Sequence, residues 1–233
     1  MNCLTSLENV NLSNNRLESV DARVFFGLSD LLNLDLSHNE ISSLDGATFK
    51  DLVSLKYLYL QKNKISFLDP STFGELSNLL TLGLEANQLK TLDSSLFNKL
   101  GKIQGISLAS NQLTSGGVTS QTFMGLKNLV SLSLSNNQLG SIRKEMFKDL
   151  VSLVIFDLSA NQIKIVDPSC FSLLADLGYL NLGSNLIANL DKKVFVGLDL
   201  LDKVDLSGNA ICATQPDYVK ALCDTNPYCS IIC

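Results

Sequence analysis

A repeat of about 24 residues runs along almost the whole of this 233-residue chain. At residues 32–52 it reads LNLDLSHNEISSLDGATFKDL, and the same order of leucine, asparagine and phenylalanine recurs on both sides. The asparagines, spaced by 24 residues with one step of 26, are Asn15, Asn39, Asn63, Asn87, Asn111, Asn137, Asn161, Asn185 and Asn209. A repeat of this length predicts a solenoid, because each unit can bury its apolar face only against its neighbours.

Each repeat begins with a short segment in which apolar and polar residues alternate, such as LLNLDL at residues 31–36. Alternation sends successive side chains to opposite faces, so the apolar residues point into the core and the residues between them point outward. Nine such segments occur between residues 7 and 206. Stacked side by side, they predict a parallel sheet along the concave face of the solenoid.

The second half of each repeat is predicted to return along the convex face. In six repeats an aspartate stands four residues before a phenylalanine, and two of these aspartates precede a proline, in Asp69-Pro70 and Asp167-Pro168. This order is typical of the start of a helical turn, so we interpret the aspartates as caps rather than catalytic groups. The predicted fold class is an α/β solenoid, a horseshoe with a parallel sheet on the concave face and short 3-10 or helical turns on the convex face.

Two columns of residues are interpreted as structural. The asparagine that follows each strand carries an amide that can pair the backbone groups left free where the chain turns out of the sheet. One phenylalanine per repeat, from Phe25 to Phe195, predicts a continuous inward stack of rings. Both columns are expected to serve the core and not a cofactor.

Three features depart from the repeat. Two extra residues around Gly116-Gly117 predict a bulge, which is either a binding loop or, as we prefer, a tolerated insertion. Cys170 is expected to be a half-buried free thiol. The chain starts in mid-repeat, so its amino edge is expected to be cut or covered by a partner. There Cys3 is predicted to be unpaired, with a bond to a missing cap or another chain as the alternative.

The other four cysteines fall within the last 22 residues and are Cys212, Cys223, Cys229 and Cys233. Their gaps of ten, five and three residues lack the close pair typical of zinc sites, so they predict two disulfides with three possible connectivities. The stretch TQPDYVKALC at residues 214–223 predicts a short helix over the last core layer. We therefore divide the chain into eight repeats at residues 1–200 and a last repeat with a Cys-rich cap at residues 201–233.

Charge and motif content argue against several classes of function. Lys and Arg total 18 against 23 for Asp and Glu, and this net charge of -5 gives no basic surface for nucleic acid. The single histidine, His38, and the lack of phosphate-loop, H-E-x-x-H and nucleophile-elbow motifs predict a chain that is not an enzyme and uses no cofactor or metal.

Cysteine usage predicts the compartment. Disulfides persist in oxidising surroundings, so the chain is expected to be secreted or displayed at the cell surface. It has no run of 18 apolar residues and no signal peptide of its own. A signal peptide is therefore expected to have been removed or left out, and contact with a membrane is expected only through a tether outside this chain.

The outward positions of the sheet are mostly small and uncharged, and two clusters depart from this background. The first cluster is His38, Tyr57, Tyr59, Gln61 and Lys62, and the second is Ile155, Asp157, Tyr179 and Asn181. Tyrosine anchors interfaces well because it brings a large contact area and a hydroxyl at low entropic cost. These clusters are the predicted ligand-binding residues. Asn11, in Asn11-Leu12-Ser13, is a candidate glycosylation site on the same face.

The repeat LxxLxLxxNxLxxLxxxxFxxL, present in nine copies over residues 7–211, resembles the "typical" leucine-rich repeats of animal extracellular proteins. In size the chain is similar to variable lymphocyte receptors and to fragments of Toll-like receptor ectodomains, which implies ligand binding on the concave face. The cysteines resemble the carboxy-terminal cap of that class, although the usual Pro-Trp and C-x-C are missing. The resemblance implies the pairs Cys212–Cys229 and Cys223–Cys233.

Three hypotheses of function follow. The leading hypothesis is a non-enzymatic extracellular module of innate-immune recognition, which binds a protein or carbohydrate ligand, a microbial surface included, on the concave face. The alternative is a structural or adhesive module that self-associates through its uncapped amino end. A third hypothesis, an intracellular scaffold, requires the terminal cysteines to be reduced.

Overall fold

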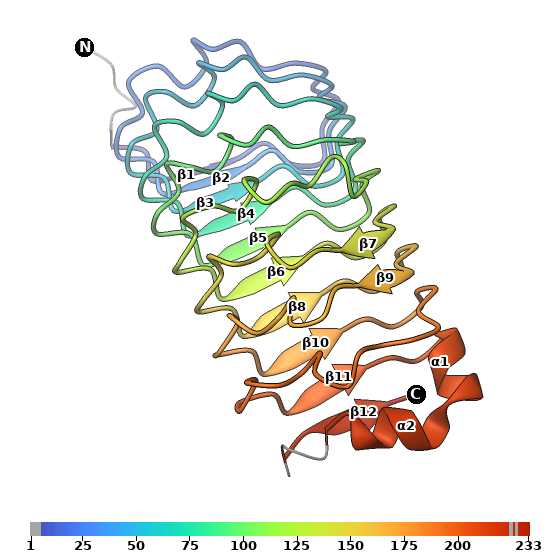
Figure 1. Cartoon of the computed structure of the whole chain (residues 1–233). Helices are drawn as coiled ribbons and strands as arrows, with labels where there is room; N and C mark the ends of the chain where they lie inside the picture. The colour runs from blue at the N-terminus through green and yellow to red at the C-terminus, as the bar shows by residue number, and fades with distance from the viewer. Residues whose placement is uncertain (1–5, 224–225, 227) are drawn as a thin grey trace.

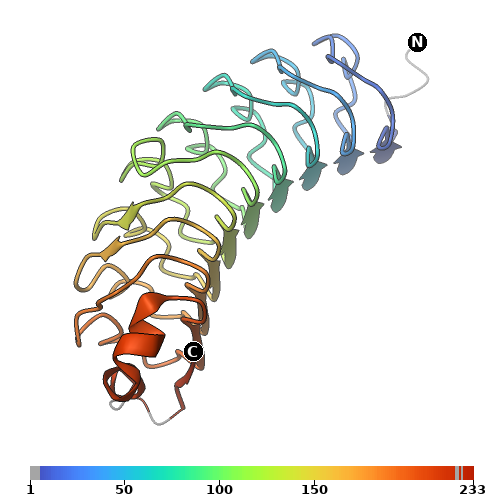
Figure 2. The same ribbon diagram turned by 90° about the vertical axis from the view of Figure 1, so that its right-hand side faces the viewer.

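One parallel sheet runs the length of the solenoid (Figure 1). Its ten strands are β1 (Asn9–Asn11), β2 (Asn33–Asp35), β3 (Tyr57–Tyr59), β4 (Thr81–Gly83), β5 (Gly105–Ser107), β6 (Ser131–Ser133), β8 (Ile155–Asp157), β10 (Tyr179–Asn181), β11 (Lys203–Asp205) and β12 (Ser230–Ile232). They lie on the inner side of the curve, as Figure 2 shows. The structure is a computed structural model that describes residues 6–223, 226 and 228–233, so the prediction for Cys3 falls outside the described residues.

The register of the sheet follows the repeat, so that residues one period apart lie side by side. Asn33 pairs with Tyr57, and Tyr57 with Thr81. The middle residue of each of these strands points inward, and Leu34, Leu58 and Leu82 are fully buried. The nine strands expected from the alternation are confirmed, and the sheet gives every outward column a straight path along the concave face.

Side-chain amides of the asparagine column join consecutive turns. Asn87 is 7% exposed. Its Oδ1 accepts a hydrogen bond from the Ile65 N–H at 3.0 Å, and its Nδ2 donates to the Leu60 and Leu84 carbonyls, each at 3.0 Å. The Leu60 carbonyl also accepts from Asn63, so neighbouring asparagines share carbonyls along the ladder. The predicted structural role of this column is confirmed.

The phenylalanine column forms a stack that is broken where Phe156 enters it. From Phe25 to Phe123 successive rings stack with centroids 6.0–6.4 Å apart. Phe156, which occupies a buried position of β8, meets Phe147 edge-on at 4.7 Å and Phe171 edge-on at 6.4 Å. The prediction of one continuous stack is therefore wrong at this point, because a ring from the sheet side lies between two rings of the column.

The convex segments are hydrogen-bonded turns rather than helices. Backbone N–H groups bond to carbonyls three residues earlier, as in Thr72 to Asp69. Aspartate Oδ1 atoms cap these turns by accepting from the N–H two residues on, in Asp21, Asp45, Asp69, Asp93 and Asp191. Asp167 differs and accepts from the Lys144 N–H of the preceding turn. Hydrogen bonds from Arg23 lower the pKa of Asp21 to about 2.

The two-residue insertion is confined to the outer side of the solenoid. There Thr114 forms a bridge with Gln138, and β7 (Ser141–Ile142) pairs with β9 (Ile165–Val166) on the side opposite the main sheet, as Figure 2 shows. The main sheet keeps its register across the insertion. The insertion thus leaves the concave face unchanged.

Gly117 fixes the path of this bulge, and its replacement by alanine is expected to destabilise the protein by about 1–3 kcal/mol, the usual cost of overpacking. A Cβ added at Gly117 would lie 2.2 Å from the backbone oxygen of Lys90, which cannot move away cheaply. At Gly116 an added Cβ would meet only the Thr114 hydroxyl, at 3.9 Å. Thermal unfolding of Gly117→Ala beside Gly116→Ala checks this. Equal melting temperatures for the two variants would contradict it.

The carboxy-terminal cap consists of α1 (Ala210–Thr214), α2 (Pro216–Ala221) and β12. The expected helix is α2, and its Val219 is buried against the core. The strand β12 extends the sheet by pairing with β11, although no repeat motif marks it. Among the described residues, no helix is long and apolar enough to cross a membrane.

Disulfides join Cys212 to Cys233 and Cys223 to Cys229. The pairing implied by the family resemblance is therefore wrong. Because β12 runs parallel to β11, Cys233 at its carboxyl end lies beside the exit of β11, from which Cys212 follows. Cys229 precedes the other end of β12, roughly 13 Å away at the usual rise of a strand, and bonds to Cys223 after α2. Cys170 is a free thiol, 4% exposed and more buried than expected, and burial raises its pKa.

Candidate functional site

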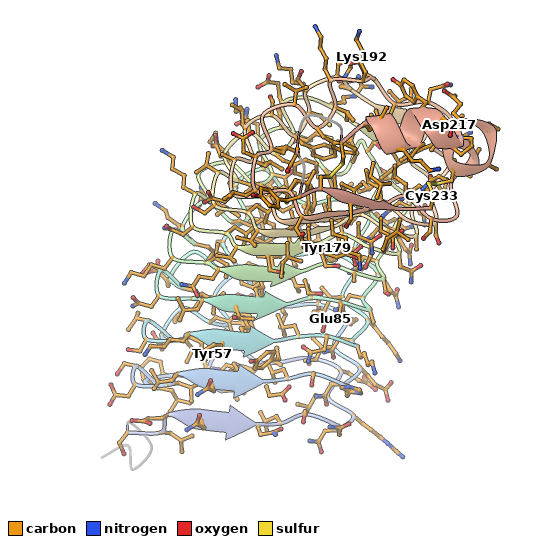
Figure 3. The ribbon with its side chains drawn as sticks, turned by 90° about the horizontal axis from the view of Figure 1, so that it is seen from below. Tyr57, Glu85, Tyr179, Lys192, Asp217 and Cys233 are labelled. Carbon is orange, nitrogen blue, oxygen red and sulfur yellow. A yellow bond between two sulfur atoms is a disulfide. The ribbon has the colours of Figure 1, made fainter. Side chains whose placement is uncertain are left out.

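The outward columns of the sheet form a face on which large side chains are few. Tyr57, Glu85 and Tyr179 lie along this face in Figure 3. The strands of Tyr57 and Tyr179 are held by ladders on both sides, so these side chains project from a rigid support, and Glu85 follows β4 by two residues. Such a face suits ligand contact, because anchors on strands lose little freedom when a partner binds.

The first predicted cluster is centred on β3. Tyr57 and Tyr59 point to the same side of this strand, and both are half-buried. Gln61 follows two residues later, next to the exposed Lys62. His38 holds the place of Lys62 one turn earlier. The backbone N–H of His38 donates a hydrogen bond to the Gln61 backbone carbonyl at 2.9 Å. The structure thus brings the five residues together, with the two tyrosines on the sheet and the other three at its exit.

His38 and Lys62 also belong to a column with a left-handed backbone, in which each has a φ of 55°. Its members are Asn14, His38, Lys62, Ala86, Ser110, Asn136, Ala160, Ser184 and Gly208. Positive φ is uncommon outside glycine and asparagine, so the backbone conformation of this column is determined by the turn that leaves each strand. Alternation in the sequence identified His38 and Lys62 only as surface residues and gave no sign of this conformation.

The second predicted cluster spans β8 and β10. Ile155 pairs with Tyr179, and Asp157 pairs with Asn181. Ile155 is 45% exposed, which is unusual for a large apolar side chain on this face. Burial, together with the charges of Asp205 and Asp157, raises the pKa of Tyr179. The four residues form one continuous patch.

The patch continues onto β11 through two residues that the sequence-based cluster omitted. Lys203 pairs with Tyr179 and places its Nζ 5.7 Å from the centre of the tyrosine ring. Asp205 pairs with Asn181 and accepts hydrogen bonds from Ser207 through Oδ1. Spacing by one period from Tyr179 and Asn181 was a signal that could have found both.

Between the two clusters lies a trough of about 380 Å³ over β4, β5 and β6. Its floor consists of small residues, namely Gly83, Gly105, Ser107, Ser131 and Ser133. Tyr59, Gln61 and Glu85 form the wall on the β3 side. Four strand spacings separate β3 from β8, so the two clusters face each other across roughly 19 Å.

Two oxygen atoms at the β3 side of the trough have no hydrogen-bond donor. Gln61 Oε1 and Glu85 Oε2 are covered by protein and unpaired. Both rest over Gly83, where an added Cβ would lie 2.8 Å from the first and 3.3 Å from the second. A covered acceptor without a donor costs roughly 1–3 kcal/mol, and a group bound in the trough reaches these oxygens only after their side chains rotate.

The chemistry available on this face is hydrogen bonding, aromatic contact and charge pairing. No group of three or more metal-ligating side chains occurs among the residues that the structure describes. Asn11, the candidate glycosylation site, is exposed on β1, and its Oδ1 accepts from the Ser13 hydroxyl at 2.7 Å. A glycan there would stand at the amino-terminal end of the face, two strands away from Tyr57.

The sequence matches a family model described as "Leucine rich repeat" at residues 5–65, 55–113, 116–163 and 151–211. These segments cover most of the chain, and the junction between the second and third falls at the insertion. The sequence matches none of the curated proteins with which it was compared.

Several solved structures are similar. A TLR13–ssRNA13 complex matches with 31% identity and a TM-score of 0.80, over 85% of this chain and 28% of that one. A repeat protein of Leptospira interrogans matches with 29% identity and a TM-score of 0.84, over 97% of this chain and 54% of that one. FLRT2, in an octameric complex with Latrophilin 3 and Unc5D, shares the fold at 22% identity and a TM-score of 0.86, over 98% of this chain and 70% of that one. The chain thus spans about a quarter to a half of the first two.

Proposed function

The chain belongs to the leucine-rich repeat family, and we propose that it is a non-enzymatic recognition module that binds a protein or glycan ligand on its concave face. The observation that carries this proposal is the pair Tyr57 and Tyr59, side by side on β3. Tyr59 borders a trough of small residues that leaves room for a ligand. Buried aromatic anchors beside open space are the usual centres of protein interfaces.

An extracellular setting is part of the proposal. Two disulfides close the cap, and disulfides are stable in oxidising compartments. The similarity to TLR13 agrees with the resemblance to Toll-like receptor ectodomains drawn from the repeat, and on that resemblance we include immune recognition, of microbial surfaces among others, in the proposal. TLR13 is found there with single-stranded RNA, but the net charge of -5 of this chain favours a ligand other than nucleic acid.

Replacing Tyr57 and Tyr59 together with alanine is expected to weaken ligand binding by at least about tenfold, because interface tyrosines commonly contribute more than 1 kcal/mol. Both side chains are outward, so the variant should keep the melting temperature of the parent to within a few degrees. The ligand is first found by screening the purified chain against arrays of extracellular domains, glycans and microbial surfaces. Surface plasmon resonance then compares the variant with the parent.

The matched control is Tyr218→Phe, which removes a hydroxyl that donates to the Leu190 carbonyl in the cap, away from the concave face. It is expected to bind the ligand as the parent does. Unchanged affinity of the Tyr57→Ala, Tyr59→Ala variant, with the fold intact, would overturn the assignment of this site.

A further inference from the structure

We infer that the trough over β4, β5 and β6 takes a cationic side chain, arginine or lysine, from a basic segment of a protein ligand. This inference rests on the proposed function and names the chemistry of the partner. It starts from Glu85, which is the only charged residue that lines the trough. The ion pairs of the structure do not include Glu85, so its carboxylate has no cationic partner among the residues that the structure describes.

Lys62, on the neighbouring turn, is a candidate for such a partner and does not fill this role. Its backbone N–H donates to the Glu85 carbonyl at 2.9 Å, which fixes the two residues side by side. Its left-handed backbone lies at the exit of the strand, and its exposed ammonium makes no ion pair in the structure. The carboxylate therefore stays free to pair with a charge from outside.

The Glu85 carboxylate favours a group rich in donors. Its Oε2 lies over Gly83 beside the Gln61 amide, and since the amide can turn over to donate to it, the carboxylate is the acceptor that keeps spare capacity in either orientation. A guanidinium has five N–H donors and no acceptor, and an ammonium has three donors and no acceptor. Rotation of the two side chains toward the trough would offer their oxygens to such a group. A neutral sugar is a poorer match for this corner, because each of its hydroxyls offers one donor and two acceptor lone pairs.

The tyrosine wall and the floor fit the same group. The Tyr59 Cδ1 atom lies 3.6 Å from the Cβ position of Gly83, so the ring borders the same corner as the two oxygens. Arginine stacks on aromatic rings while it pairs with carboxylates. The floor at Gly105 is open, since a Cβ there would meet only Thr81 atoms at 3.9 Å. The aliphatic part of a long side chain can therefore lie across β5.

The far side of the trough extends the charge pattern. Ser133 on the floor pairs with Asp157 on β8. Asp157 uses Oδ1 to hold Ser159, and its Oδ2 forms no hydrogen bond in the structure. Carboxylates thus stand at both sides of a floor that carries no cation. Opposite charges across an interface speed association and select the partner, so a ligand segment with basic side chains is the complementary surface.

The test uses the whole chain and three small probes in a nuclear magnetic resonance titration of the backbone amides. The probes are the peptide acetyl-Gly-Arg-Gly-amide, the same peptide with neutral citrulline in place of arginine, and methyl β-glucopyranoside. The arginine peptide should shift the amides of Gly83 and Gly105 in a saturable manner. It should bind about tenfold more tightly than the citrulline peptide, because a charge-assisted pair with a carboxylate is lost in the latter. Raising the salt concentration from about 0.1 M to about 1 M should weaken binding of the arginine peptide, because salt screens the charge pair.

Two variants of nearly unchanged size locate the charge. Glu85→Gln should weaken binding of the arginine peptide by about tenfold. Glu75→Gln removes the same charge outside the concave face and should leave the binding unchanged, since exposed charges beyond a Debye length are screened.

Equal binding of the arginine and citrulline peptides, or no shift at Gly83 and Gly105, would overturn the inference. Tight binding of the glucoside that Glu85→Gln does not affect would overturn it in favour of a glycan. The proposed function is judged separately with the screened ligand. If the double tyrosine variant loses that ligand while Glu85→Gln keeps it, the recognition module stands and the cationic inference fails. If both variants keep it, both proposals fail.

Discussion

Replacing Phe97 with alanine is expected to lower the free energy of unfolding by about 3–5 kcal/mol, the usual range for a phenylalanine deleted from a core. Phe97 is fully buried. Its ring stacks on Phe73 at 6.4 Å and on Phe123 at 6.0 Å, so its loss opens a cavity between two turns. The rigid ladders on either side of the cavity limit how far the turns can collapse into it. Denaturant unfolding followed by circular dichroism measures the effect.

Phe67→Ala is the matched control for this substitution. Its side chain is 63% exposed, so removing it should change the stability by less than about 0.5 kcal/mol. A loss at Phe97 no larger than that at Phe67 would contradict the view that the aromatic column holds consecutive turns together.

Asn87→Ala is expected to cost about 2–4 kcal/mol, because roughly 1–3 kcal/mol attaches to each buried backbone group left without a partner. The variant leaves the Ile65 N–H unpaired. It also removes one of two donors from the Leu60 and Leu84 carbonyls, which keep those of Asn63 and Asn111. The sharing of carbonyls keeps the expected loss below that of three independent orphaned groups.

Asn15 provides the control within the same column. It donates to the carbonyls of Leu12 and Ser13 but lies exposed at the first turn, where water can replace it. Asn15→Ala should therefore cost less than about 1 kcal/mol. Chemical denaturation of the two variants compares them directly, and similar losses at both positions would show that the ladder contributes no more inside the solenoid than at its end.

The fold could be predicted wherever the repeat itself carries the structure. The positions of Leu34, Asn39 and Phe49 recur with the period, and each repeat obeys the same packing rule, so one unit predicts the others. The break in the aromatic stack had a visible cause, since Phe156 replaces an aliphatic residue at an inward strand position. The sequence pattern does not say how far that strand position lies from the phenylalanine column, so the contact between the rings could not be predicted.

The cap escaped prediction because it lies outside the repeat. The strand Ser230–Ile232 has no asparagine or leucine motif, and it forms only because β11 offers an open edge. The disulfide pairing then follows from the parallel direction of that strand. Cysteine spacing alone leaves all three connectivities open, since spacing holds no information about which ends of two strands lie together.

The candidate site was predicted in its parts but not as a surface. Alternation identified Tyr57, Tyr59 and Tyr179 as outward residues, and the register confirms their neighbours. The trough depends on what is missing from Gly83 and Gly105, and absent side chains give no signal when residues are ranked by size. Glu85 could be identified as a candidate only from the structure, in which it lines the trough and forms no ion pair.

The most direct test of concave-face recognition places a glycan on either side of the solenoid. Ser131→Asn creates the acceptor sequence N-L-S at residues 131–133 in β6, within the trough. Glu75→Asn creates the same N-L-S sequence at residues 75–77, an exposed site outside the sheet. Each protein is produced in a glycosylating host, its glycan is verified by mass spectrometry, and binding of the screened ligand is measured. Recognition through the concave face predicts that the glycan at residue 131 abolishes binding and the glycan at residue 75 leaves it intact. Full binding with the glycan at residue 131 would contradict the account.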